Sequence, residues 1–158
     1  MHDDHASNQP TWIRDTPSWL ISQTALIAQR IVNDALAAEG ARRYHVAVLS
    51  ALAEFGPSSQ AEIGRRCGID RSDIAAVMNE LEGQGLIERR RDPNERRRNI
   101  VSLTEAGQAR HAQLDRIVVA AQEALLAPLA RDERSDLAEM LGRIVVHHHQ
   151  PELESRQE

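Results

Sequence analysis

Residues 59–81 of this chain read SQAEIGRRCGIDRSDIAAVMNEL, and the spacing of their side chains predicts two short helices. Ser59 and Glu62 are spaced as a capping box, in which two side chains three residues apart satisfy each other's exposed backbone donors at the start of a helix. The spacing predicts a short helix that begins at Ser59. Ile63 and Cys67 lie four residues apart and are expected on its inner face.

A second helix is predicted after a very short turn. Only Gly68 and Ile69 separate the first helix from Asp70, which has the position and chemistry of an N-cap. Ile69 and Ile74 have the spacing of a hydrophobic staple, which fixes the angle at which the chain enters a helix. Two short helices joined by so tight a turn predict a helix-turn-helix.

The second helix has one apolar and one polar face, and it is predicted to end near Gly83 or Gly85. Ile74, Val77 and Leu81 are expected in the core. The other face carries side chains that are short enough to let the backbone approach DNA or polar enough to contact base edges: Arg71, Ser72, Ala75, Ala76 and Asn79. We expect DNA contacts from Arg71, Ser72, Ala76 and Asn79, although Arg71 and Asn79 would also suit a solvated helix face.

The N-terminus of the first short helix is a second candidate DNA contact. Ser59 and Gln60 are expected to bind phosphate there, because helix N-termini favour anions. The capping role alone would also explain Ser59.

A basic hairpin is predicted after the helix-turn-helix. Residues 86–91 and 98–103 have the pattern of two strands, and Pro93 presets the turn between them. From Leu86 to Arg98 there are six Arg and three acidic residues, an excess of three positive charges in a chain whose net charge is −5. A charge run alone is usually a solvated surface. Directly after a helix-turn-helix, a basic patch on an acidic body favours DNA binding through one surface.

The rest of the chain is predicted to be helical apart from its ends. We expect a flexible arm over 1–17 and helices over 18–56, before the winged helix-turn-helix over 57–104. Two further helices are expected over 105–149, with an interruption at Pro128, followed by a polar tail over 150–158. Thr104 is expected to cap the first of the C-terminal helices. The terminal helices carry apolar stripes that we expect to be buried against a second subunit: Leu20, Ile27, Ile31, Ala35, Leu137, Met140, Leu141, Ile144 and Val145.

Composition agrees with a single, mainly α domain. The chain has 158 residues, of which 41% are hydrophobic and only 3% aromatic, as expected for helices packed through aliphatic side chains. The absence of a long apolar run and of a signal peptide predicts a cytoplasmic protein without a membrane partner. A single cysteine, Cys67, excludes an internal disulfide. Neither a catalytic set of residues nor a cofactor motif is present, which argues against an enzyme and against a cofactor.

Residues 92–107, DPNERRRNIVSLTEAG, closely resemble the wing signature of the MarR family of multiple antibiotic resistance regulators. The similarity continues in residues 60–66 and 81–87 and covers roughly residues 18–147. The resemblance implies a winged helix-turn-helix with long N- and C-terminal helices that form a dimerisation domain. It also implies a homodimer that places a recognition helix of each subunit in the major groove of duplex DNA and a wing in the adjacent minor groove.

The resemblance assigns roles within the wing. Arg97 matches the family's wing-tip Arg, which enters the minor groove, where narrow A·T-rich DNA concentrates negative potential. Glu95 stands where the family usually has Asp and is expected to orient Arg97 through a charge-assisted pair. Arg96 and Arg98 are expected to contact phosphates, which fix position without specifying sequence.

The signal that releases such a regulator is the most open point. Trp19, Tyr44 and His45 are candidates for binding a small phenolic or planar effector, and packing at the dimer interface is an equally good interpretation of Trp19 and Tyr44. His45 and His111 are the candidate ligands if the regulator senses zinc instead. A constitutive DNA-binding protein without an effector is a third hypothesis. Cys67, at an inward-facing position, is expected to be a small buried apolar group and not a redox sensor.

Overall fold

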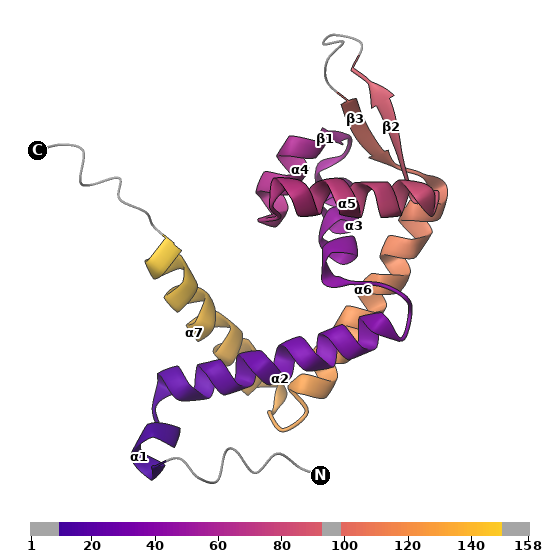
Figure 1. The fold of residues 1–158 in the computed structure, drawn as a ribbon. Coiled ribbons are helices and arrows are strands. Elements are labelled where there is room, and N and C mark those ends of the chain that lie inside the picture. The colour runs from indigo at the N-terminus through magenta and orange to yellow at the C-terminus, as the bar shows by residue number, and fades with distance from the viewer. Residues whose placement is uncertain (1–9, 93–98, 150–158) are drawn as a thin grey trace, which may run out of the picture. The chain divides into compact units, whose positions relative to one another are not determined.

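The computed structural model describes residues 10–92 and 99–149 and is mainly helical, as predicted (Figure 1). Its elements are α1 (Thr11–Arg14), α2 (Pro17–Ala37), α3 (Arg43–Phe55), β1 (Ser58–Ser59), α4 (Gln60–Cys67), α5 (Arg71–Gly83), β2 (Ile87–Arg91), β3 (Asn99–Leu103), α6 (Glu105–Leu125) and α7 (Arg131–His149). The chain divides into two compact units after Gln122. None of the helices within the described ranges is long and apolar enough to cross a membrane.

The helix-turn-helix consists of α4 and α5, and its local signals act largely as predicted. The Glu62 N–H donates to Ser59 Oγ at 3.3 Å, and the Ser59 N–H donates to Glu62 Oε2 at 2.8 Å, which completes the capping box. Gly68 ends α4 in the left-handed conformation, with φ of 62°, which a residue without Cβ adopts at little cost. The next residue, Ile69, donates its N–H back to the carbonyl of Gly64.

Asp70 corrects one detail of this motif. It occupies the N-cap position of α5, but within the described residues its side chain accepts no hydrogen bond from the first turn of that helix. The staple residues Ile69 and Ile74 are both buried in the core. The entry of the chain into α5 is therefore fixed by apolar burial instead of by a capping side chain.

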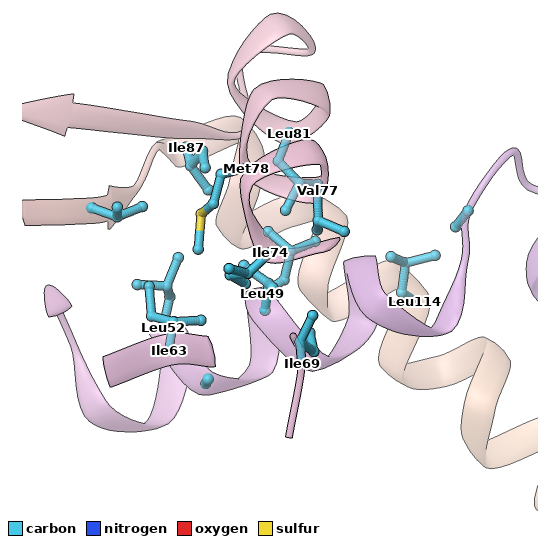
Figure 2. Packing of buried hydrophobic residues seen from close by; sticks show 14 of the residues in the cluster. Leu49, Leu52, Ile63, Ile69, Ile74, Val77, Met78, Leu81, Ile87 and Leu114 are labelled. Carbon is cyan, nitrogen blue, oxygen red and sulfur yellow. The ribbon is translucent and has the colours of Figure 1, made fainter. Parts of the chain in front are cut away.

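The core of the first unit is built from α2, α3, α4, α5, β2, β3 and α6 (Figure 2). Ile74, Val77 and Leu81 are buried, as predicted, and so is Met78, which lies one turn after Ile74 on the same side of α5. Replacing such a side chain with Ala typically destabilises a protein by about 2 to 5 kcal/mol. The buried face of α5 thereby determines which face of this helix remains exposed.

The wing is a three-stranded antiparallel sheet in the order β1-β3-β2. Ile87 pairs with Leu103 and Arg89 pairs with Val101 in the register of β2 and β3. The sequence did not indicate β1, whose Ser58 and Ser59 pair with Val101 and Ile100. A two-residue strand has too few positions to show an alternating pattern.

The start of α6 is anchored against the wing. Thr104 accepts the Gly107 N–H at 3.0 Å, as predicted for a cap, and its hydroxyl also donates to the carbonyl of Gly85. Gly107 is buried, and a Cβ at this position would overlap the carbonyl oxygen of Leu86. The helix ends at Leu125, before Pro128, which agrees with the predicted interruption.

The N-terminal segment is more regular than expected. The predicted arm over 1–17 is wrong for Thr11–Arg14, which form α1, and for Pro17, which is the first residue of α2. Pro is well suited to the first position of a helix, because the N–H that it lacks would have no partner there. The predicted arm over 1–9 and the tail over 150–158 lie outside the described residues.

Two helices expose large apolar side chains. On α2 these are Leu20, Ile21, Leu26 and Ile27, and on α7 they are Met140, Leu141, Ile144, Val145 and Val146. Several of them belong to the stripes that the sequence assigned to a dimer interface.

Candidate nucleic-acid interface

The exposed face of α5 brings the predicted base-reading residues together. Arg71, Ser72, Ala76 and Asn79 are all exposed, and Ala75 is half-buried between them and the core. This follows from the helical period, since burial of Ile74, Val77, Met78 and Leu81 turns the intervening positions to solvent. Apart from Arg71, the side chains on this face are short, so DNA bases can approach the helix closely.

The start of α4 lies beside this face. Gln60, Arg65 and Arg71 line a surface hollow of about 800 Å³ between α4 and α5. Arg65 was not predicted as part of the site. It is exposed in the last turn of α4, and its place beside α5 depends on the packing of the two helices.

Ser59 is engaged in internal hydrogen bonds. Its hydroxyl accepts the Glu62 N–H and donates to Glu62 Oε2 at 2.7 Å, and the residue is buried. The neighbouring Gln60 is half-buried and lies on the hollow. Of the two predicted phosphate contacts at this helix end, only Gln60 therefore has a side chain beside open space.

The arginines of β2 face in two directions because side chains alternate along a strand. Arg89 points toward α5, where its Nη2 donates to Asn79 Oδ1 at 2.6 Å and its Nε lies 3.2 Å from Glu82 Oε2. Arg90 is exposed and pairs with Glu88 at 3.0 Å. The basic patch is thus divided between residues that pack on α5 and residues that face solvent.

The wing tip carries the remaining predicted contacts, and Glu95, Arg96, Arg97 and Arg98 lie outside the described residues. The two strands that flank this tip are described. Arg91 at the end of β2 pairs with Asn99 at the start of β3, and both are exposed.

His45 has a structural environment that differs from the predicted effector or zinc site. It is only 5% exposed, its Nδ1 accepts the Arg42 N–H at 3.3 Å, and its Nε2 donates to Glu80 Oε2 at 2.9 Å. The Arg42 guanidinium pairs with the same carboxylate. The hydrogen bond from His45, followed by that from Arg42, lowers the pKa of Glu80 below its ordinary value. Both ring nitrogens of His45 are occupied in linking α3 to α5, and its role in binding an effector or zinc stays a prediction.

The other effector candidates are not gathered with His45. Tyr44 is exposed and lies beside a hollow of about 750 Å³ that is also lined by Asn33, Arg42, Arg43 and Cys67. Trp19 is half-buried on α2 and lines neither this hollow nor the smaller one described next. Its predicted contact with an effector stays a prediction.

A smaller and mainly apolar hollow of about 350 Å³ lies among α2, α3 and α6. Val32, Leu36, Val46 and Val118 contribute to its wall, and Arg43 is its charged residue. The sequence did not indicate this site, because its walls come from three helices that are far apart along the chain.

His111 and Cys67 also have partners of their own. His111 Nε2 lies 3.1 Å from Ser50 Oγ, and no group of three or more His, Cys, Asp or Glu side chains within 10–92 and 99–149 is placed to hold a metal ion. The Cys67 thiol donates to the carbonyl of Ala47 at 3.4 Å, and burial raises its pKa. A raised pKa disfavours the reactive thiolate, which agrees with the prediction of an unreactive thiol.

Comparison with known proteins gives consistent matches. A family model described as the MarR family matches residues 41–98. The HTH-type transcriptional repressor NicR of Pseudomonas putida is 41% identical over 61 residues, which are 39% of this chain and 39% of NicR. The chain therefore spans well under two thirds of this curated relative.

Solved structures match over nearly their whole length. The PcaV transcriptional regulator of Streptomyces coelicolor is 30% identical with a TM-score of 0.71, and the match covers 84% of this chain and 97% of PcaV. PcaV has also been solved in complex with its natural ligand, with 29% identity over 87% of this chain and 96% of PcaV. The transcriptional repressor CouR, solved with a 23-mer DNA duplex, is 28% identical with a TM-score of 0.77, and the match covers 87% of this chain and 97% of CouR.

Proposed function

The chain belongs to the MarR family of DNA-binding transcriptional regulators, and we propose that it is a homodimeric repressor that a small molecule releases from a pseudo-palindromic operator. The observation that carries the proposal is the exposed face of α5, with Arg71, Ser72, Ala76 and Asn79, followed directly by the basic wing. CouR, a repressor of similar fold, has been solved on duplex DNA. By analogy, α5 would enter the major groove and the wing tip with Arg97 the adjacent minor groove.

Charge and helix ends support contacts with the DNA backbone. Gln60 and Arg65 lie beside the base-reading candidate Arg71 around the hollow between α4 and α5. Backbone contacts of this kind set the register of a protein on DNA, whereas Arg71, Ser72 and Asn79 would read base edges. Ala76 would permit the close approach. Glu95 would orient Arg97, with Arg96 and Arg98 on phosphates.

The exposed apolar faces of α2 and α7 support dimer formation. Ile27 on α2 is 44% exposed and Val145 on α7 is 54% exposed. Burial of such surface is favourable by about 25 cal/mol for each Å² removed from water. A homodimer through these helices would hold two copies of α5 at the fixed spacing that an inverted repeat requires.

The hollow among α2, α3 and α6 is the effector site that we propose. Its wall is mainly apolar, and Arg43 offers a positive charge for an acidic group on a planar ligand. PcaV, which has a similar fold, has been solved with its natural ligand. A ligand that binds better to a dimer with misplaced recognition helices would shift the population away from the DNA-binding form.

Replacement of the wing-tip arginine tests the DNA-binding proposal. In a gel shift on the DNA upstream of the chain's own gene, Arg97→Ala should weaken binding by about tenfold or more, because it removes a cation from the minor groove. Arg116→Ala, at an exposed position of α6, is the charge-matched control and should change affinity little. Equal affinity of Arg97→Ala and the parent protein would refute the wing assignment, provided that both remain dimers by light scattering.

A further inference from the structure

Arg89 and Asn79 form a contact between the wing and the proposed recognition helix. Arg89 Nη2 donates to Asn79 Oδ1 at 2.6 Å. An arginine offers only N–H donors, so the group of Asn79 that faces it must be the carbonyl oxygen and not the amide nitrogen. The contact therefore fixes the orientation of the Asn79 side chain at the exposed face of α5.

The position of Arg89 in the sheet directs its side chain toward α5. Arg89 pairs with the buried Val101 across β2 and β3, so both side chains lie on the face of the wing that meets the core. Its side chain is only 23% exposed, and its Nε lies 3.2 Å from Glu82. Arg90, the next residue, faces solvent and pairs with Glu88. Approach of DNA to the wing thus need not displace Arg89 from α5.

The orientation of Asn79 limits what it can read. An asparagine that recognises adenine uses both ends of its carboxamide, because Oδ1 accepts from N6 while Nδ2 donates to N7. With Oδ1 turned toward Arg89 and one of its two lone pairs occupied there, the Nδ2 donors become the groups of Asn79 that are better placed for a base. Guanine offers two adjacent acceptors, O6 and N7, in the major groove, and thymine offers O4. Adenine offers one acceptor, N7, beside its N6 amino group, which would face the Asn79 donors unfavourably.

We propose that Arg89 is a positioning residue that makes Asn79 a donor-only reader of the major groove, selective for guanine or thymine over adenine. The inference rests on the proposed function, since it requires α5 to lie in the major groove. Arg89 would thereby influence sequence preference without contacting a base.

The test begins with duplexes selected by the parent protein from a random pool and again by Asn79→Ala. The position whose preference is lost in the variant is the one that Asn79 reads, and we expect guanine or thymine there. If guanine is selected, replacement with 7-deazaguanine, which lacks the N7 acceptor, should weaken binding of the parent protein by about fivefold, the effect of one hydrogen bond. If thymine is selected, 4-thiothymine, whose sulfur is a poorer acceptor than O4, should weaken binding of the parent protein to a similar extent. The analogues leave the protein unchanged, so no loss of folding can explain this result.

Arg89→Met provides the second arm, with Arg90→Met as its matched control. Both remove one positive charge from β2, but only Arg89→Met frees Asn79 Oδ1. We expect Arg89→Met to gain tolerance of adenine at the Asn79 position, and Arg90→Met to keep the parent preference at reduced affinity.

Three results would overturn the inference: adenine at the Asn79 position with binding that depends on its N6 amino group, no position at which Asn79→Ala changes preference, or identical preferences in the two methionine variants. If the parent protein selects no sequence at all, the proposed function itself fails, which distinguishes the two failures.

Discussion

Gly107 controls how closely α6 approaches the wing. It lies in the first turn of α6 and is buried against Leu86, and a Cβ at this position would lie 2.9 Å from the Leu86 carbonyl carbon and still closer to its oxygen. The Leu86 carbonyl also accepts the Thr104 N–H, so the turn that leads into β2 cannot move away without loss of that bond. The absence of a side chain at Gly107 thus connects the DNA-binding lobe closely to α6.

Gly107→Ala should therefore destabilise the protein by about 2 to 4 kcal/mol, because the clash is with backbone and not with the flexible end of a side chain. The free energy of unfolding in urea measures this change. Gly142→Ala on α7 is the matched control, since an added Cβ there meets nothing within 4 Å and should stabilise the helix by about 0.5 to 1 kcal/mol. Similar effects of the two substitutions would contradict the close approach at Gly107.

Single residues also show what the sequence could predict. The Ser59 capping box and the Gly68 helix end were predicted correctly, because each depends on residues within four positions along the chain. Asp70 was wrongly predicted as a capping side chain, because its neighbours Ile69 and Ile74 fix the helix start by burial. The role of Gly107 could not be predicted, since Leu86 lies 21 residues earlier, in the turn between α5 and β2.

At the level of elements, His45 and Arg42 connect α3 to the proposed recognition helix through Glu80. Glu80 is the acceptor of both side chains, and these hydrogen bonds hold its pKa below the ordinary value. Glu80 lies 35 residues after His45, so sequence spacing gave no sign of the contact. For the same reason the sequence gave no sign of the contact of Arg89 with α5.

The lowered pKa of Glu80 predicts how this link depends on pH. The ionised carboxylate stabilises the folded state, so its contribution is complete above the ordinary glutamate pKa of about 4.3 and is lost as pH falls through the lower pKa of the folded state. The difference in unfolding free energy between the parent protein and Glu80→Gln should therefore be present at pH 7 and shrink below about pH 4.

Urea unfolding between pH 3 and 7 measures this difference. Glu54→Gln, at an exposed position of the same helix as His45, is the matched control for loss of one carboxylate. The change in unfolding free energy caused by Glu80→Gln could instead stay constant with pH or equal that caused by Glu54→Gln. Either result would show that the link between α3 and α5 does not depend on the carboxylate.

At the scale of the whole molecule, the sequence predicted the class of fold because its signals are local and periodic. The helices from α2 onward, the tight turn and the strands β2 and β3 all follow from spacing within a few residues. The hollow among α2, α3 and α6 could not be predicted, because its residues are brought together only by packing. The apolar stripes on α2 and α7 were recognisable, and their exposure in the single chain supports the proposed dimer.

In the proposed function, two copies of α5 in one dimer read one operator. Selection of bound duplexes from a random pool, followed by sequencing, tests it most directly. We predict an inverted repeat whose half-sites are centred about one helical turn, or about 10 base pairs, apart. Enrichment of a single unrepeated site, or of no sequence at all, would show that the chain does not read DNA as a dimer with two copies of α5.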